Sequence, residues 1–256
     1  MLPRHETYQV LAYHGTRNLG DAIQTVAISQ VLPAVVGVYR HKMHLADKTI
    51  PLVVNGWIGD LFDTCTLPTS GIVHYCGIHA AQQHFRNYRH DDVIGARDRY
   101  TVDKLRGFGL KSELVGCATL LFARSHGPRN GIYSVDFPGP GQPVSHSIPP
   151  DMPWSDQWDL ALRLLEKYRT ASVVYTGRLH ALLPCLAFGT PVRFFAAAFG
   201  PERFSVLDFL HLDVTGIVED FDVRPYQAAF IRFMADCLQT KLALGEPKFP
   251  AVVIGE

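Results

Sequence analysis

Short apolar runs alternate with helix-like segments along most of this chain, and this alternation constrains its fold more than any other feature. Residues 8–13 form an apolar run typical of a buried strand, and a polar turn with glycine separates them from a predicted helix over 21–32. The same order returns with a strand at 171–176 and a helix at 177–188. Strands that alternate with helices indicate parallel α/β architecture.

The remaining segments extend this pattern. Further strands are predicted at 51–54, 71–75, 113–115, 131–135 and 190–195, and further helices at 99–108, 156–168 and 226–238. The charged segment 123–130 contains Gly and Pro and is the predicted domain junction. We therefore expect an N-terminal half over 1–123 and a C-terminal half over 124–256. The helix at 226–238 is expected to close across both halves, with a dimer face as the alternative.

A proline-rich stretch interrupts the second half. Residues 138–153 contain six prolines and show little periodicity, so we predict an ordered but irregular loop near a cleft.

Charge and cysteine content limit the partners and the compartment. Lys plus Arg and Asp plus Glu are 24 each, so no overall field draws the chain to nucleic acid, and anion binding must be local. The five cysteines are scattered without a C-x-x-C pair, which indicates reduced thiols and a cytoplasmic protein. No apolar run approaches the roughly 18 residues of a membrane span, so we expect at most peripheral membrane contact.

The residues best suited to chemistry follow the predicted strand at 171–176. Arg178 and His180 lie where that strand turns into a helix. Ligands bind at such carboxyl ends of parallel strands, and a helix N-terminus there attracts anions. Arg binds carboxylate or phosphate through paired hydrogen bonds, and His exchanges protons near neutral pH. An ion pair of Arg178 with a core carboxylate, with His180 as a capping or packing residue, is an equal alternative from these residues alone.

The surrounding motifs resemble those of the polysaccharide pyruvyl transferase family. Residues 178–191 match its R-L-H-x8-G-x-P segment, and Asn18-Leu19-Gly20-Asp21 is similar to its N-x-G-D turn. The blocks Asn55-Gly56-Trp57 and Ile94-Gly95-Ala96-Arg97-Asp98 also resemble family blocks, in the same order. Gly116-Cys117-Ala118-Thr119-Leu120 looks like the variant of a short subgroup, whereas many members carry Asp-Pro at this place.

The resemblance implies a GT-B-like fold, in which two Rossmann-type halves with parallel sheets face each other across a cleft. It implies an enzyme that transfers a pyruvyl group from phosphoenolpyruvate to a saccharide as a ketal, in exopolysaccharide or glycoconjugate biosynthesis. Phosphoenolpyruvate would be a co-substrate, with no further cofactor. The acceptor would be a saccharide or a lipid-linked glycan.

The same resemblance assigns roles to residues. His180 and Arg178 would be catalytic, and the donor would be bound by Arg97 and Arg178 together with Asn18, Gly20 and Asp21. A donor with both a carboxylate and a phosphate requires at least two cationic groups, and these two arginines would supply one from each half. Apart from the resemblance, the residues that would contact the acceptor are Trp57, Asn55, His79 and His14. Trp57 and His14 come at or after the ends of predicted strands, and a purely structural role is the alternative for both.

Other interpretations of the same residues stay open at this point. His74, Cys76, His79 and His84 lie close in sequence but lack the spacing of a metal site, so none is expected. A nucleotide-sugar glycosyltransferase of the same fold would use a carboxylate in the second half, where Glu202 and Asp208 are the candidates. A non-catalytic relative would bind an anion without turnover.

Overall fold

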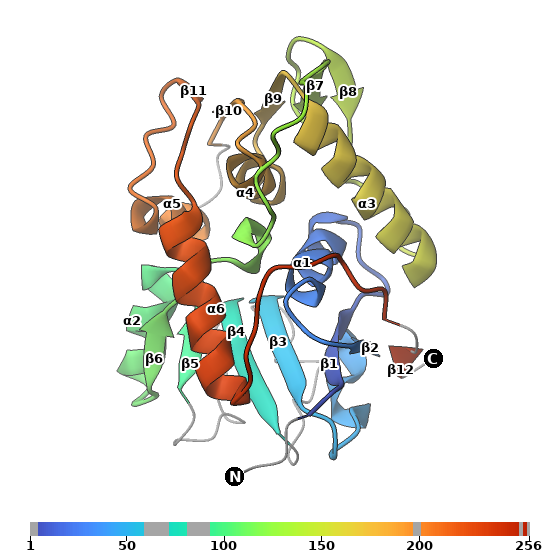
Figure 1. Ribbon diagram of the computed structural model, residues 1–256, viewed down its shortest axis with the longest axis vertical. Coiled ribbons are helices and arrows are strands. Elements are labelled where there is room, and N and C mark those ends of the chain that lie inside the picture. The colour runs from blue at the N-terminus through green and yellow to red at the C-terminus, as the bar shows by residue number, and fades with distance from the viewer. Residues whose placement is uncertain (1–4, 59–71, 81–92, 197–200, 251–252, 255–256) are drawn as a thin grey trace.

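The computed structural model of the protein contains two separate β-sheets, and helices lie between and around them (Figure 1). The structure describes residues 5–58, 72–80, 93–196, 201–250 and 253–254. The predicted α/β class with two mostly parallel sheets is confirmed, and the arrangement is consistent with a GT-B-like fold of two halves.

The first sheet contains seven strands in the order β12-β2-β1-β3-β4-β5-β6, and all of its strand pairs are parallel. Its strands are β1 (Tyr8–Ala12), β2 (Val35–Tyr39), β3 (Leu52–Trp57), β4 (Val73–His79), β5 (Ile94–Ala96), β6 (Ser112–Leu114) and β12 (Val253–Ile254). The carboxyl ends of the strands therefore share one edge of this sheet, which is where parallel sheets bind ligands.

The second sheet contains five strands in the order β11-β10-β9-β7-β8, and only the β10–β11 pair is antiparallel. Its strands are β7 (Ile132–Val135), β8 (Gln142–Val144), β9 (Val173–Thr176), β10 (Val192–Phe194) and β11 (Ile217–Val218). The predicted irregular loop at 138–153 thus contains a short strand, β8. Pro143 is tolerated there because β8 is at the edge of the sheet, where a missing N–H breaks no ladder.

The helices belong to both halves. The α-helices are α1 (Gly20–Ser29), α2 (Arg99–Gly107), α3 (Trp154–Thr170), α4 (Leu179–Phe188), α5 (Ser205–Phe209) and α6 (Arg224–Leu238). The 3-10 helices are η1 (Arg40–Leu45), η2 (Ala118–Leu120) and η3 (Pro201–Phe204). Every residue of α1 is buried, because α1 contacts strands of its own sheet on one side and α3 and α4 of the second half on another.

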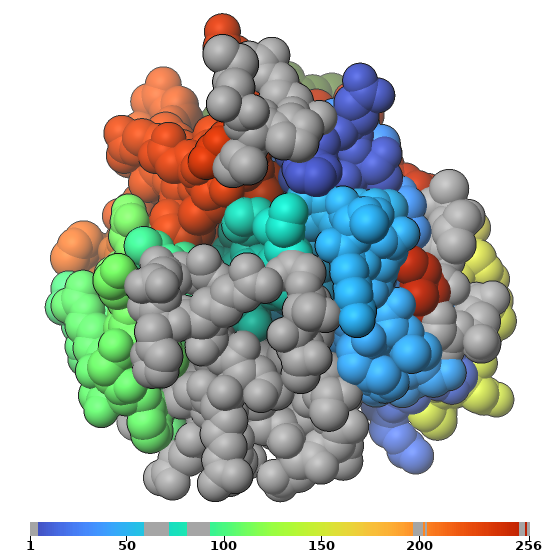
Figure 2. Space-filling view, turned by 90° about the horizontal axis from the view of Figure 1, so that it is seen from below, coloured from blue at the N-terminus to red at the C-terminus, as the bar shows by residue number. Residues whose placement is uncertain are grey.

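The C-terminal part of the chain returns to the first sheet. Strand β12 pairs with β2, and α6 lies against β4 (Figure 1). Seen from below, α6 in orange-red borders the teal and blue residues of the first sheet (Figure 2). The Phe230 and Phe233 rings pack so closely on Gly77 and Gly95 that a Cβ at either glycine would lie 2.6 Å from a ring carbon. The change of sheet falls near the predicted boundary at 123/124, but the segment after residue 224 lies with the first half. The division into two folding units stays a prediction.

Backbone contacts also join the halves beside the cleft. Ser147 forms an antiparallel bridge with Asn18, and the Leu19 N–H donates to the His146 carbonyl at 2.8 Å. The Ile148 N–H donates to the Arg17 carbonyl at 3.2 Å. The proline-rich segment therefore holds the turn after β1 in a fixed position relative to the second half.

Among the described residues, no helix is both long enough and apolar enough to span a bilayer. The same residues contain no cluster of His, Cys, Asp and Glu that fits a metal ion, and His84 and Cys65 lie outside the described residues.

Candidate functional site

A cavity of about 270 Å³ lies between the two halves and brings several predicted site residues together. The first half contributes residues that follow the strands of its sheet, namely Thr16, Asn18, Asp21, Arg40, Trp57 and Arg97. The second half contributes His146, Arg178, Leu179 and His180. Arg97 and Arg178, predicted to face each other across a cleft, thus line one cavity.

The turn between β9 and α4 has the geometry that the sequence predicted. Strand β9 ends at Thr176, Arg178 is the N-terminal cap of α4, and the helix begins at Leu179. The Thr176 hydroxyl oxygen accepts the Arg178 N–H at 2.9 Å and fixes this turn. His180 therefore lies in the first turn of α4, beside amide groups that have no partner within the helix.

Asp136 orients Arg178 from the end of the neighbouring strand β7. The Arg178 Nε donates to Asp136 Oδ2 at 2.9 Å, and Arg178 is partly exposed at the cavity. Burial alone would raise the pKa of Asp136, but hydrogen bonds from Ser145 and from the His146 N–H, with the charge of Arg178, hold it below its usual value. The ion pair considered from the sequence therefore exists, and it leaves the outer nitrogens of Arg178 for a ligand.

The N-x-G-D turn of the first half contacts His180 directly. A Cβ at Gly20 would lie 2.6 Å from His180 Nδ1, so only glycine permits this approach. Asn18 Oδ1 accepts the Gly20 N–H at 3.2 Å, and Asp21 Oδ2 accepts the Thr16 hydroxyl at 2.8 Å. The conformation of this turn therefore determines how close His180 comes to α1.

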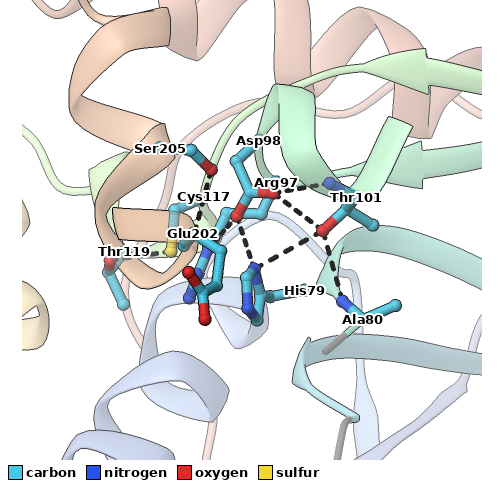
Figure 3. A network of polar contacts seen from close by, with 9 residues as sticks. All are labelled: His79, Ala80, Arg97, Asp98, Thr101, Cys117, Thr119, Glu202 and Ser205. Atoms are coloured by element: carbon cyan, nitrogen blue, oxygen red, sulfur yellow. Dashed lines mark hydrogen bonds and ion pairs between the residues drawn. The ribbon is translucent and has the colours of Figure 1, made fainter. Parts of the chain in front are cut away.

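Arg97 is held by a buried polar network (Figure 3). Its Nε donates to Asp98 Oδ2 at 3.0 Å, and the same oxygen lies 2.6 Å from His79 Nδ1. Asp98 is the N-terminal cap of α2, and its Oδ1 accepts both the N–H and the hydroxyl of Thr101. Burial alone would raise the pKa of Asp98, but the hydrogen bond with His79 and the charge of Arg97 outweigh burial and hold it well below its usual value.

His146 is a buried residue of the lining that the sequence analysis did not assign. Its side chain is 1% exposed, and its Nε2 lies 2.7 Å from the Tyr168 hydroxyl. Burial lowers the pKa of His146 to about 4. The charge of Asp136 raises this pKa and the charge of Arg178 lowers it, and both effects are smaller than that of burial. The imidazole is therefore neutral near pH 7.

Three of the four predicted acceptor residues are not among the cavity-lining residues that the structure describes. Asn55 is fully buried and donates from Nδ2 to the Gln24 carbonyl, and His79 is fully buried beside Asp98. His14 is exposed and contacts the rings of Tyr39 and His41. Trp57 does line the cavity.

A bulge separates Asn55 from Trp57. Gly56 has a φ of +87°, and the register of β3 against β4 shifts at this point, so simple strand alternation does not describe the side-chain directions.

Arg40, Thr16 and Asp136 were also not predicted from the sequence. Arg40 and Asp136 directly follow β2 and β7. The signal that identifies Asp136 is a carboxylate after a predicted strand, whereas Arg40 follows a strand that was not predicted. The Cys117 Sγ of the variant block lies 3.1 Å from the Thr119 hydroxyl, beside the Arg97 network (Figure 3), and burial raises its pKa.

Comparisons with known proteins agree with the motif analysis. Residues 76–197 match the profile of the polysaccharide pyruvyl transferase family, which confirms the resemblance stated from the sequence. The match includes both arginines and His180 but not the N-x-G-D turn. No curated protein matches the chain significantly.

One solved structure that matches is an uncharacterised protein from Klebsiella pneumoniae. It is 16% identical in sequence, with a TM-score of 0.47, over 78% of this chain and 88% of that one.

Proposed function

We propose that this protein, whose segment 76–197 matches the polysaccharide pyruvyl transferases, transfers a pyruvyl group from phosphoenolpyruvate to a saccharide as a ketal. The observation that supports this most is the presence of Arg97, Arg178 and His180, from opposite halves, in the lining of one cavity. We infer a setting in cytoplasmic polysaccharide or glycoconjugate biosynthesis. The free thiols of Cys76, Cys117, Cys185 and Cys237 agree with a reducing compartment.

The donor is a small molecule with a carboxylate and a phosphate, and the two arginines suit these groups. Each guanidinium is held at Nε by a carboxylate, Asp98 for Arg97 and Asp136 for Arg178. In Arg178 this leaves the terminal nitrogens for a ligand, and they donate in a fixed planar geometry. The α4 N-terminus adds amide donors beside Arg178.

His180 is the proposed acid and base. One sugar hydroxyl adds to C2 of the donor while His180 protonates the C3 methylene, which becomes the methyl group. The C–O bond to phosphate then breaks, and the second hydroxyl attacks C2 to close the ketal. One hydroxyl proton returns to His180 and the other leaves with the phosphate, so the reaction regenerates the catalyst.

A turnover assay tests this proposal. The protein is incubated with phosphoenolpyruvate and a panel of glycans, and both phosphate release and the mass of the ketal product are measured. His180→Asn should keep donor binding and reduce turnover by roughly 10²- to 10⁴-fold. Arg178→Ala should lose donor binding as well, whereas Arg17→Ala, a change at an exposed arginine outside the lining, should resemble the parent.

Three results would contradict the proposal. Donor binding without any product across the panel would indicate a non-catalytic relative. Sugar transfer from a nucleotide sugar would indicate a glycosyltransferase, for which Asp208 is exposed on α5 and Glu202 lies in η3. Unchanged turnover in His180→Asn would assign the proton transfer to another residue.

A further inference from the structure

We propose that Arg40 forms a second anion-binding subsite in the cleft, and that the saccharide acceptor therefore carries a phosphate or a carboxylate group. This inference rests on the proposed transfer to a saccharide and names the chemical class of that saccharide.

Arg40 is held in place before any ligand arrives. It is the first residue after β2, at the carboxyl edge of the first sheet, and it lines the same cavity as Arg97 and Arg178. Its Nη1 donates to the Trp57 carbonyl at 3.1 Å, and its Cζ lies 4.9 Å from the centre of the Tyr13 ring. An arginine restrained in this way loses little conformational entropy when it binds an anion.

Arg40 differs from Arg97 and Arg178 in its bonding partners. Arg97 and Arg178 each donate from Nε to a carboxylate. Within the part of the chain that the structure describes, Arg40 forms no ion pair, and its one hydrogen bond goes to a neutral carbonyl. Among the described residues, four of its five guanidinium N–H donors therefore have no hydrogen-bond partner. Such a group beside a cavity suits an anionic substituent.

Arg40 and Arg97 approach the cavity from opposite parts of the sheet. The strand order β2-β1-β3-β4-β5 puts four strand spacings, about 19 Å at about 4.8 Å each, between their backbones. The Arg40 side chain reaches Trp57 on β3, so both guanidinium groups line one cavity. Arg97 and Arg178 already match the phosphate and the carboxylate of the donor. The third cationic group, Arg40, is therefore assigned to an anion on the acceptor.

Trp57 lies between these two cationic positions. It ends β3, which the sheet order places between β2 and β5, and it lines the cavity, with its ring 4.9 Å from that of His79. An aromatic face suits the apolar face of a sugar ring. A sugar on Trp57 would direct one side toward Arg40 and the other toward the donor at Arg97 and Arg178. The order of side chains thus matches an acidic saccharide whose charge lies opposite its reacting hydroxyls.

Direct binding measurements test the subsite without any need for turnover. Glucose, galactose and mannose are compared with their 1-phosphates, their 6-phosphates and their uronic acids by calorimetry. The matched variants are Arg40→Gln and Arg17→Gln, the latter at an exposed arginine outside the lining. Phosphates and uronates are separate arms, so the panel identifies which anion the site accepts.

At least one anionic sugar should bind the parent about tenfold more tightly than its neutral counterpart, the effect of one charge-assisted contact. Arg40→Gln should abolish that preference, and Arg17→Gln should retain it. Two outcomes would overturn the proposal: no preference for any anionic sugar in the parent, or an equal preference in Arg40→Gln. Phosphoenolpyruvate binding to the parent is measured in a separate titration. A parent protein that does not bind phosphoenolpyruvate would contradict the proposed function. The comparison of the parent with Arg40→Gln on anionic sugars would still decide whether the subsite exists.

Discussion

The buried imidazole of His146 should make the stability of this protein sensitive to mild acid. Its side chain is 1% exposed, and burial lowers its pKa from 6.5 to about 4. Between these two values the unfolded chain binds more protons at this residue than the native protein does. The free energy of unfolding therefore falls as pH falls through this window, and the contribution is fully present only above pH 6.5.

The size of this effect follows from the two pKa values. From pH 7 to pH 5, proton binding to the unfolded chain at His146 should lower the free energy of unfolding by about 2 kcal/mol. His146→Gln removes the titrating group while an amide can still reach the Tyr168 hydroxyl. The variant is expected to be less stable at pH 7 but to lose about 2 kcal/mol less than the parent on acidification.

Urea unfolding at pH 7 and pH 5 measures the difference. His44→Gln, at an exposed histidine, is the matched control and should keep the acid sensitivity of the parent. The reasoning would be refuted if His146→Gln and the parent lost the same stability between the two pH values. It would also be refuted if His44→Gln removed the acid sensitivity.

Three further predictions follow from single contacts. Gly20→Ala puts a Cβ 2.6 Å from His180 Nδ1 and should displace His180, so turnover should fall by about tenfold or more while circular dichroism shows a retained fold. Turnover equal to that of the parent would contradict the fixed position of His180. Arg129→Ala removes hydrogen bonds to the Phe188 and Gly189 carbonyls at the end of α4. The free energy of unfolding, measured with urea, should fall by about 2 to 3 kcal/mol, and a fall below about 0.5 kcal/mol would contradict this. Asp136→Asn should weaken donor binding in calorimetry by about tenfold because it loosens Arg178, and unchanged binding would assign that role elsewhere.

The sequence predicted those parts of the fold that depend on local pattern. The strand ending at Thr176 and the helix at α4 were identified because a long apolar segment is interrupted by one polar turn, and Arg178 and His180 occupy that turn. Arg97 and Trp57 lie in the cavity lining, as expected from the rule that ligands bind at the carboxyl ends of parallel strands.

The missed parts depend on tertiary contacts. Strand β2 was not predicted because Gly37 interrupts it and Pro33 precedes it, and Arg40 was missed with it. Strand β12 has two residues and exists through its pairing with β2, so no local pattern identifies it. His146 lies in a proline-rich segment, and its position depends on backbone bonds to the turn after β1.

Arg97 and Arg178 are proposed to bind one donor molecule together, and a double-mutant cycle on phosphoenolpyruvate binding tests this. Calorimetry would compare the parent, Arg97→Gln, Arg178→Gln and the double variant. If both arginines contact the same dianion, each single change should weaken binding strongly. The loss of binding free energy in the double variant should then be smaller than the sum of the two single losses, by a coupling energy of about 1 kcal/mol or more. Strictly additive losses, or an unchanged affinity in either single variant, would show that the two arginines do not share the donor.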